Sequence, residues 1–192
     1  MKAGVLALQG DFREHAAMFA ACGATPILVR TTEDLATVDC LAIPGGESTT
    51  IAKLARAYGL IEPIKDRAFR GMPVFGTCAG MIVMANRVRD GEPLLSLLDV
   101  AVRRNAYGRQ VDSFVGTVEA PALGGEMPAV FIRAPKIRRV GGGVEVLATR
   151  GGEPVLVRQG HVVAATFHPE LTDDDRVHRL CFEASGRRRK SA

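Results

Sequence analysis

The sequence predicts an α/β fold, an open and mostly parallel sheet with helices on both faces and strand-rich additions in the second half. Two observations carry this prediction. In the first half, short apolar runs alternate with segments of helical spacing, which is the pattern of parallel strands connected by helices. In the second half, apolar runs follow one another across glycine-rich breaks, and only the last segment is helical.

The first half contains four expected strands and four expected helices. Phe12, Ala16 and Phe19 recur at helical spacing. We expect Ser48 to cap a helix and Gly71 to end one. The expected strands are residues 4–8, 25–29, 40–43 and 73–75, and the expected helices are residues 12–22, 48–58, 61–70 and 79–86. Ligands bind outside the carboxyl ends of parallel strands, so we expect the site in the turns that follow these strands.

The second half contains six expected strands before one final helix. The helix is expected over residues 173–184, because Thr172 can cap it and acidic residues in its first turn favour the helix dipole. The glycines at residues 141–143 and 151–152 are typical of hairpins or loops. The expected strands are residues 100–105, 111–118, 129–132, 144–148, 155–158 and 162–167.

Length and composition indicate one folded domain. The chain has 192 residues, of which 47% are hydrophobic and 24% charged, ordinary values for a globular protein. At about 150 residues per domain, we expect residues 1–185 to form a single domain. Residues 186–192 include four consecutive basic residues, and we expect a solvated, mobile tail there. No apolar run approaches the roughly 18 residues of a membrane span, so we expect no membrane role.

Charge and cysteine content narrow the function classes further. The formal charge is +4, but the basic tail supplies all of this excess, and no aromatic residue is interleaved with it. We therefore expect no nucleic-acid partner. The N-terminal apolar run stops at Gln9, too early for a signal peptide. The four cysteines form no CxxC pair, so we expect reduced thiols, a cytoplasmic location and no metal site.

Residues 76–80, Gly-Thr-Cys-Ala-Gly, are the sharpest chemical motif. Their form, Gly-x-nucleophile-x-Gly between a strand and a helix, is typical of a nucleophile elbow. The tight turn strains its central residue, and flanking side chains would collide with backbone. Cys78 would then lie at a helix N-terminus, which stabilises a thiolate, and the N–H of Ala79 would point at an oxyanion. A merely buried cysteine at a strand end is the alternative.

The second motif is Phe167-His168-Pro169-Glu170, after an apolar run. A nucleophilic cysteine needs a base, and the base needs a group that orients it. Residues two apart in an extended segment project to the same side, and Pro169 favours extension at His168. Glu170 can therefore reach the imidazole of His168. A turn histidine beside a solvated carboxylate is the alternative.

A third motif and the remaining histidines are less specific. Residues 44–48, Pro-Gly-Gly-Glu-Ser, could expose backbone N–H groups to an anion or supply a second oxyanion donor, but an ordinary strand-to-helix turn is the simpler interpretation. His15 and His178 are expected to be surface or packing groups in helices. His161 precedes a strand and has no carboxylate two residues on. No histidine pairing suits a metal.

In this order the motifs resemble those of class I (triad) glutamine amidotransferases, and most closely the PdxT/SNO family, the glutaminase subunits of pyridoxal 5′-phosphate synthase. The resemblance covers residues 4–182, nearly the whole chain. The elbow and the His-Pro-Glu segment mark the superfamily, and the other segments point to this family. The segments are residues 8–15 (LQGDFREH), 44–50 (PGGESTT), 76–80 (GTCAG), 103–110 (RRNAYGRQ), 130–135 (VFIRAP) and 167–172 (FHPELT).

The resemblance implies a class I glutamine amidotransferase-like fold and hydrolysis of L-glutamine to L-glutamate and ammonia through a glutamyl thioester. Cys78 would be the nucleophile, His168 the base and acid, and Glu170 the group that orients it. Backbone N–H groups at Gly46 and Ala79 would hold the oxyanion. The residues implied to hold glutamine are Gly46, Glu47, Ser48, Arg104, Ile132 and Arg133.

Charge agrees in part with this implied binding site. Glu47 suits the α-ammonium group of glutamine, and Arg104 or Arg133 suits the α-carboxylate, with the choice between the arginines open. The resemblance also implies no metal or organic cofactor, and a partner in a large hetero-oligomer, the PdxS/SNZ-type subunit of pyridoxal 5′-phosphate synthase, which takes up the ammonia.

Three alternative functions remain open on the sequence. They are the glutaminase subunit of another amidotransferase, a cysteine-dependent γ-glutamyl hydrolase or peptidase, and a regulatory module whose Cys78 senses redox state. The basic tail is the clearest departure from the family pattern.

Overall fold

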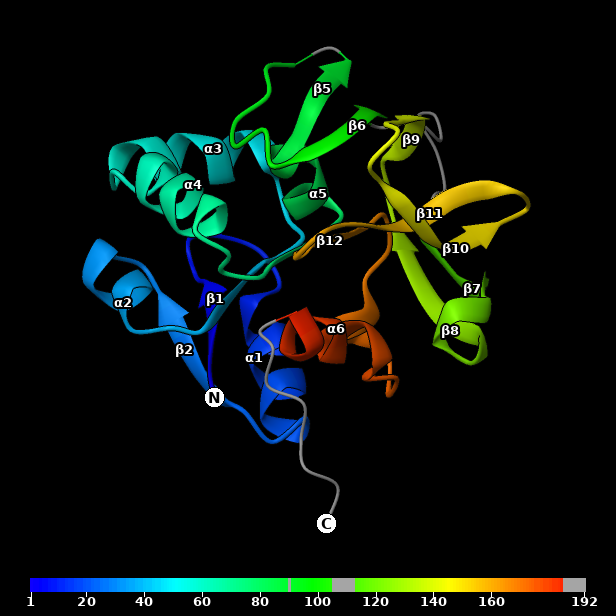
Figure 1. Ribbon diagram of the computed structural model, residues 1–192, viewed down its shortest axis with the longest axis horizontal. Coiled ribbons are helices and arrows are strands. Elements are labelled where there is room, and N and C mark those ends of the chain that lie inside the picture. Colours follow the sequence, from blue (N-terminus) through cyan, green and yellow to red (C-terminus); the bar gives the residue numbers. More distant parts are fainter. Residues whose placement is uncertain (90, 105–112, 185–192) are drawn as a thin grey trace.

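The computed structural model describes residues 1–89, 91–104 and 113–184. Its centre is a nine-stranded sheet in the order β2-β1-β3-β4-β12-β11-β10-β7-β8 (Figure 1). The first five strands of this order pair in parallel, as expected for an α/β fold. Their bounds are β1 Lys2–Leu6, β2 Thr25–Val29, β3 Cys40–Ile43, β4 Val74–Thr77 and β12 Val162–Ala165.

The other four strands are the strand-rich additions of the second half. They pair antiparallel and extend the sheet outward from β12. Their bounds are β7 Ser113–Ala120, β8 Gly125–Ile132, β10 Glu145–Arg150 and β11 Glu153–Gln159. A separate three-stranded sheet contains β5 Ala85–Arg89, β6 Leu98–Arg103 and β9 Lys136–Val140.

Helices cover both faces of the large sheet (Figure 1). On one face, α1 and α6 share a core that contains Phe19, Phe75 and Val177. On the other face, the core contains Ile64 and Met81 and joins α2 to α5. The bounds are α1 Phe12–Ala21, α2 Thr32–Ala36, α3 Ser48–Ala57, α4 Ile61–Phe69, α5 Ala79–Met84 and α6 Arg176–Ala184, with 3-10 turns η1 Pro121–Leu123 and η2 Pro169–Leu171.

Two predictions about helix starts are wrong. Glu47, not Ser48, is the N-cap of α3, and its carboxylate accepts a hydrogen bond from the Thr49 N–H. The final helix begins at Arg176 rather than at residue 173. Thr172 and Asp174 accept hydrogen bonds from N–H groups two residues further on, and such local turns compete with helix formation.

Other elements were missed or have different bounds, some of them because of pairing that is distant in sequence. The helix expected over residues 79–86 ends at Met84, because Ala85 begins β5 and pairs with β6. The unpredicted helix α2 has only five residues and depends on a capping box at Thr31. The unpredicted strand β9 is rich in basic residues and pairs with β6. The strand expected over residues 4–8 is observed as β1, which begins and ends two residues earlier in the sequence. The strand expected over residues 162–167 is observed as β12, which ends two residues earlier.

No helix among the described residues is long and apolar enough to cross a membrane. The basic tail over residues 186–192 lies outside the described residues, as do parts of the strands expected over 100–105 and 111–118. That residues 1–185 form a single domain stays a prediction.

Candidate active site

Neighbouring parallel strands bring the predicted motifs to one edge of the sheet. β1, β3, β4 and β12 lie side by side, and the segments that follow them carry Asp11, Gly46, Cys78 and His168. The backbone N–H of Cys78 donates a hydrogen bond to the carbonyl oxygen of Ala165, 2.9 Å away, which ties the end of β4 to that of β12. The site therefore forms at the carboxyl ends of parallel strands, where the sequence predicts it.

The backbone around Cys78 has the geometry of the predicted elbow. Cys78 has φ 47° and ψ −101°, and α5 begins at the next residue. A positive φ is strained for a residue with a side chain. The flanking glycines are needed sterically, because a Cβ on Gly80 would collide with the carbonyl oxygen of Ile43, and a Cβ on Gly76 would lie 2.8 Å from the Gly80 carbonyl carbon. The turn therefore holds the sulfur at a helix N-terminus.

The imidazole of His168 is held by hydrogen bonds on one side of the ring. Its Nδ1 lies 2.8 Å from Oε1 of Glu170, the contact that the sequence predicts. The segment after His168 is a 3-10 turn, η2, rather than an extended strand, so the expected contact is made by a different backbone path. The Gly45 Cα is packed against the ring, since a Cβ there would overlap it. These contacts fix the orientation of the base.

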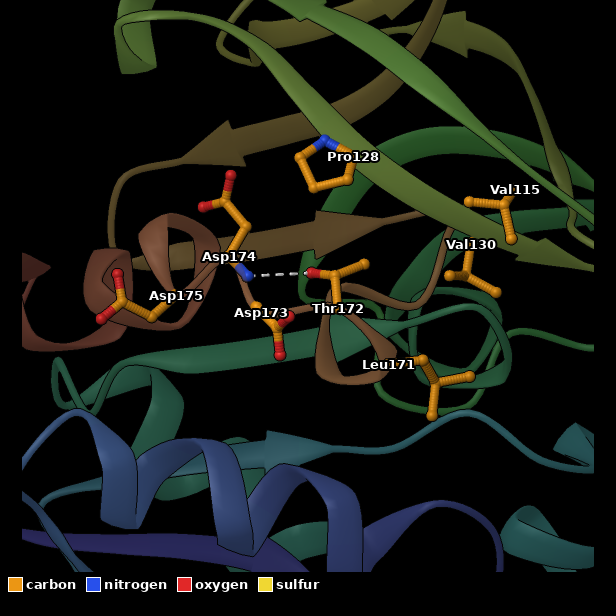
Figure 2. Close-up of a pocket in the computed structure, with 8 residues that line it drawn as sticks. All are labelled: Val115, Pro128, Val130, Leu171, Thr172, Asp173, Asp174 and Asp175. Carbon is orange, nitrogen blue, oxygen red and sulfur yellow. Dashed lines mark hydrogen bonds between the residues drawn. The ribbon is translucent and has the colours of Figure 1, made fainter.

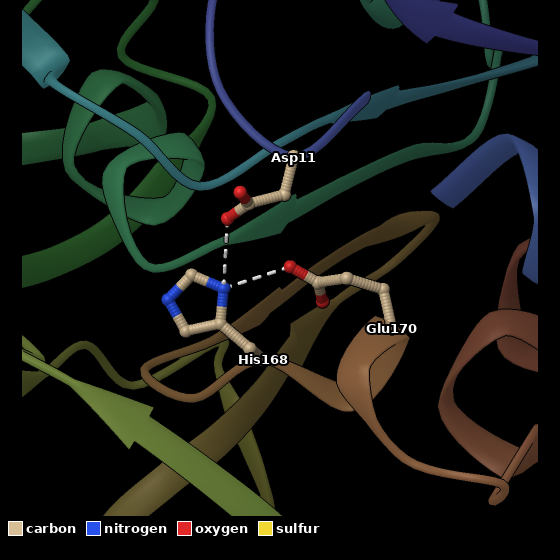
Figure 3. Close-up of side chains that lie close together, drawn as sticks. All are labelled: Asp11, His168 and Glu170. Carbon is tan, nitrogen blue, oxygen red and sulfur yellow. Dashed lines mark hydrogen bonds and ion pairs between the residues drawn. The ribbon is translucent and has the colours of Figure 1, made fainter. Parts of the chain in front are cut away.

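A second carboxylate reaches the same ring nitrogen. Oδ2 of Asp11 lies 3.3 Å from Nδ1 of His168, and Figure 3 shows both carboxylates on this side of the ring, with Nε2 on the other. Asp11, His168 and Glu170 could by their spacing also hold a metal ion. Such an ion would replace the hydrogen bonds that orient His168. The expectation that the site uses no metal stays a prediction.

The pKa values of the His168 and Glu170 pair are shifted in opposite directions. Burial acts to lower the pKa of His168, but its interactions with Asp11, Cys78 and Glu170 outweigh burial and raise it. Burial acts to raise the pKa of Glu170, but the attraction and hydrogen bonds of His15 and His168 lower it. Each shift favours the charged form, so the pair favours an imidazolium beside a carboxylate.

A cavity of about 260 Å³ opens beside these groups. Cys78 and His168 both line it, while Glu170 lies behind the histidine. Of the residues that the sequence analysis proposes for binding or catalysis, those lining the cavity are Gly46, Glu47, Ser48, Cys78, Ala79, Arg104, Ile132, Arg133 and His168. The predicted residues therefore meet in one place.

The cavity lining also carries an ion pair. Nη2 of Arg104 lies 3.1 Å from Oε1 of Glu47. The thiol of Cys78 donates a long hydrogen bond, 3.7 Å, to the carbonyl oxygen of Ile132. Arg133, the next residue, has a φ of 44°. Both charges needed to recognise an amino acid backbone are thus present beside the nucleophile.

Three lining residues, Gln9, Asp11 and Ile82, are not among those predicted from the sequence. Oε1 of Gln9 accepts a hydrogen bond from the Glu47 N–H at 2.7 Å, and this contact holds the glycine turn against the end of β1. The signal for Gln9 and Asp11 was their position directly after the first expected strand. Ile82 gave no signal, since its position on α5 is that of a packing residue.

Of the two interpretations of His15 and His178, a surface position is wrong and packing is confirmed, since both rings pack against phenylalanines. Both side chains are fully buried. Nδ1 of His15 lies 2.9 Å from Nε2 of His178, and Nε2 of His15 lies 3.0 Å from Oγ1 of Thr77. Helical periodicity places a histidine inside or outside the protein, but it does not reveal a partner from another helix.

A second and larger cavity, of about 550 Å³, lies on the outer side of β7 and β8 (Figure 2). Val115, Pro128 and Val130 form its apolar side, and Asp173 and Asp174 belong to its acidic side. It contains neither a cysteine nor a histidine. The larger cavity therefore lacks the nucleophile and base that the smaller cavity has.

The solved structures agree with this fold. A chain described as the crystal structure of a glutamine amidotransferase aligns with a TM-score of 0.91 at 51% sequence identity, covering 96% of this chain and 98% of that chain. The structure of PurLQS from Thermotoga maritima aligns with a TM-score of 0.72 at 17% identity, over 95% of this chain and 97% of that one. At this low identity the second likeness shows the fold alone.

Similar sequences agree over almost the whole chain. Pyridoxal 5′-phosphate synthase subunit PdxT of Pelotomaculum thermopropionicum is 55% identical over 95% of this chain and 94% of its own length. The protein of the same name from Mycobacteroides abscessus is 53% identical over 92% of this chain and 93% of its own length. The model of the SNO glutamine amidotransferase family matches residues 5–185. With the elbow, the histidine and the carboxylate at one edge of the sheet, this chain belongs to the SNO glutamine amidotransferase family.

Proposed function

We propose that this chain hydrolyses L-glutamine to L-glutamate and ammonia through Cys78, His168 and Glu170, and that it delivers the ammonia to a PdxS/SNZ-type subunit that makes pyridoxal 5′-phosphate. One observation carries the proposal. A cysteine on a strained turn and a buried histidine line one cavity, and a carboxylate forms a hydrogen bond with Nδ1 of that histidine. Membership of a glutamine amidotransferase family and the names of the relatives support the same substrate and product.

The first step is acylation of the cysteine. The Cys78 thiolate attacks the side-chain carbonyl carbon of glutamine, the S–C bond forms, and the carbonyl π electrons move to oxygen. Backbone N–H groups at Gly46 and Ala79 hold this oxyanion. The imidazolium of His168 gives its Nε2 proton to the amide nitrogen. The carbonyl then re-forms, the C–N bond breaks, and ammonia leaves. The raised pKa of His168 supports this charged starting state.

The second step is hydrolysis of the glutamyl thioester. Neutral His168 accepts a proton from a water molecule, whose oxygen attacks the thioester carbon. The tetrahedral intermediate breaks its C–S bond, so that glutamate is released and Cys78 leaves as a thiolate. His168 is again an imidazolium, balanced by Glu170. These steps use no metal and no organic cofactor.

Glutamine is recognised through the two charged groups on its α-carbon. The Glu47 carboxylate pairs with the α-ammonium group, and the Arg104 guanidinium, already in contact with Glu47, takes the α-carboxylate. Each of the two protein charges then gains a partner on the substrate in place of the other. The other residues proposed to contact the bound glutamine are Gly46, Ser48, Ile132 and Arg133.

Delivery to a partner follows from the chemistry of the product. Ammonia in water takes up a proton and loses its nucleophilic lone pair, so a direct transfer within a hetero-oligomer protects it. We place the single glutaminase domain at residues 1–185. A cytoplasmic location suits a nucleophile that must stay a reduced thiol, and Cys78 is a free cysteine.

Release of glutamate from glutamine, measured with and without the synthase subunit, tests the proposal. Cys78→Ala should lower the rate by at least about 10³-fold, with far-UV circular dichroism unchanged because the substitution is small. Cys22→Ala, at a buried free cysteine outside the pocket, is the matched control and should keep the wild-type rate. Activity retained in Cys78→Ala, or cleavage of γ-glutamyl conjugates without hydrolysis of free glutamine, would reject the proposal.

A further inference from the structure

A group of buried polar side chains lies behind Glu170 and outside the pocket. His15 is on α1, His178 on α6, and Thr77 is the last residue of β4, and all three are fully buried. We propose that His15 is a positioning residue of the glutaminase, which together with Thr77 keeps the Glu170 carboxylate ionised and aimed at His168. The inference rests on the triad assigned under Proposed function.

The contacts converge on one carboxylate oxygen. Oε1 of Glu170 lies 2.8 Å from Nδ1 of His168, 3.4 Å from Nε2 of His15, and 3.5 Å from Oγ1 of Thr77. Nε2 of His15 is also 3.0 Å from Oγ1 of Thr77. His15 therefore reaches the carboxylate both directly and through a hydroxyl of the residue that precedes the nucleophile.

The proton positions can be assigned from His178, the last residue in this series of hydrogen bonds. Nδ1 of His178 has no hydrogen-bond partner among the described residues. Burial, and to a smaller extent the electrostatic effect of His15, lowers the pKa of His178 well below its ordinary value. A neutral ring with a lone pair at Nδ1 avoids a buried N–H without an acceptor, which is the costlier and rarer case. The proton of His178 is therefore on Nε2, and it is donated to Nδ1 of His15.

The proton that His178 donates to His15 also sets the direction of the remaining hydrogen bonds. Since Nδ1 of His15 accepts, the proton of a neutral His15 is on Nε2, which faces Thr77 and Glu170. The Thr77 hydroxyl accepts from His15 and gives its own hydrogen to the carboxylate. The Thr77 hydroxyl thus points its hydrogen at Glu170, and the Nε2–H of His15 faces Thr77 and Glu170 together, an arrangement that favours the ionised carboxylate.

The surroundings offer no packing reason for a histidine at this position. The His15 ring meets Phe75 edge-on at 5.8 Å between centroids, and Phe19 meets His178 at 5.2 Å. An apolar ring would fill such a place without the cost of burying polar nitrogens. His15 is also absent from the cavity lining. Its effect on the reaction must therefore act through Glu170 on His168.

The test compares two substitutions of His15 in the full chain with its synthase subunit. His15→Phe keeps a ring but loses both nitrogens, and should lower kcat for glutamine about 10–100-fold with KM within about 2-fold. His15→Gln places an amide N–H near the original Nε2 and should recover most of that loss. A chloroketone analogue of glutamine that alkylates the nucleophile counts the functional sites, so that kcat excludes unfolded protein.

Two further variants separate positioning from packing. Phe19→Leu, on the same helix and against the same histidine pair, should lower the unfolding temperature but leave kcat per functional site unchanged. Thr77→Val, which keeps the shape and removes the hydroxyl, should lower kcat. Combined with His15→Phe it should cost less than the product of the two single effects, because both act on one oxygen.

Three outcomes would overturn the inference. They are wild-type kcat per functional site in both His15→Phe and Thr77→Val, a Gln variant no better than the Phe variant, and an equal loss in Phe19→Leu. If the wild-type chain itself hydrolyses no glutamine in the complex, the proposed function fails along with the inference. If the wild type is active and the His15→Phe and Thr77→Val variants match its kcat, the inference alone fails.

Discussion

The two walls of the candidate pocket are built differently. On the proposed catalytic wall, Cys78 and His168 are 7% and 2% exposed, and Glu170, which lies behind the histidine, is 6% exposed. On the recognition wall, the paired side chains of Glu47 and Arg104 are 49% and 24% exposed. The first wall is held by backbone strain and buried hydrogen bonds, and the second by one ion pair beside solvent.

This difference matches what each wall has to do. In a buried setting water does not compete, so hydrogen bonds keep a base within a fraction of an ångström of its working position. An exposed ion pair contributes only about 0–1 kcal/mol, so Glu47 and Arg104 can separate at little cost when a charged substrate enters. We expect changes on the catalytic wall to act on kcat and changes on the recognition wall to act on KM.

Among the variants that compare the two walls, His168→Asn should have the largest effect, and this effect should be on kcat. It removes the only group in the proposed mechanism that carries a proton between the leaving nitrogen and water, so kcat should fall about 10³–10⁴-fold. Steady-state assays of the complex measure this directly. A loss confined to KM would instead place His168 with the recognition residues.

Glu170→Gln should have a smaller effect, about 10–100-fold in kcat. The amide keeps the shape of the side chain and can still accept from Nδ1 of His168, but it removes the charge that balances the imidazolium. Single-turnover measurements should assign the loss to the chemical steps. A variant as slow as His168→Asn would mean that charge, and not orientation, is the main contribution of Glu170.

On the recognition wall, Arg104→Ala should raise the KM for glutamine about 10-fold and leave kcat within about 3-fold. The reason is that the guanidinium contacts the substrate equally in the ground state and the transition state. Arg158→Ala removes an exposed ion pair with Glu145 outside the pocket and is the matched control. A larger KM effect in Arg133→Ala would assign the α-carboxylate to Arg133 instead.

The smallest expected effect is on the pH dependence of stability. Burial opposes the shift, but His15 and His168 lower the pKa of Glu170 from its ordinary 4.5. Its stabilising contribution is therefore present above pH 4.5 and is lost as the pH falls through the lowered pKa. The free energy of unfolding of the wild type, measured with urea, should fall below pH 4.5 by up to roughly 1 kcal/mol per pH unit. In Glu170→Gln this free energy should depend less steeply on pH. Equal slopes would contradict the lowered pKa.

Local pattern was enough to locate the chemistry of the site. The elbow at Cys78 needs glycines on both sides, and only Pro169 separates His168 from Glu170, so both motifs are visible in the sequence. The carboxyl ends of parallel strands then predicted that these loops meet, and the shared cavity agrees. The resemblance to a known family supplied Arg104 and Ile132, which no local pattern had singled out.

Other features could not be predicted because their partners are distant in the sequence. The expected helix extends to residue 86, yet residues 85–89 form β5 because β6 offers backbone partners. Asp11 reaches His168 across 157 positions of the chain, and His15 reaches His178 across 163. A single sequence carries no record of which buried histidine faces which.

The sequence by itself determined the α/β fold class, the strained cysteine turn and the histidine with its carboxylate, because each depends on patterns of residues a few positions apart. Only the tertiary structure decided that two carboxylates share one imidazole nitrogen and that a pair of buried histidines lies behind the site. Burial is the physical reason: it removes water as a partner, so each polar group depends on whichever neighbour the fold brings within about 3 Å.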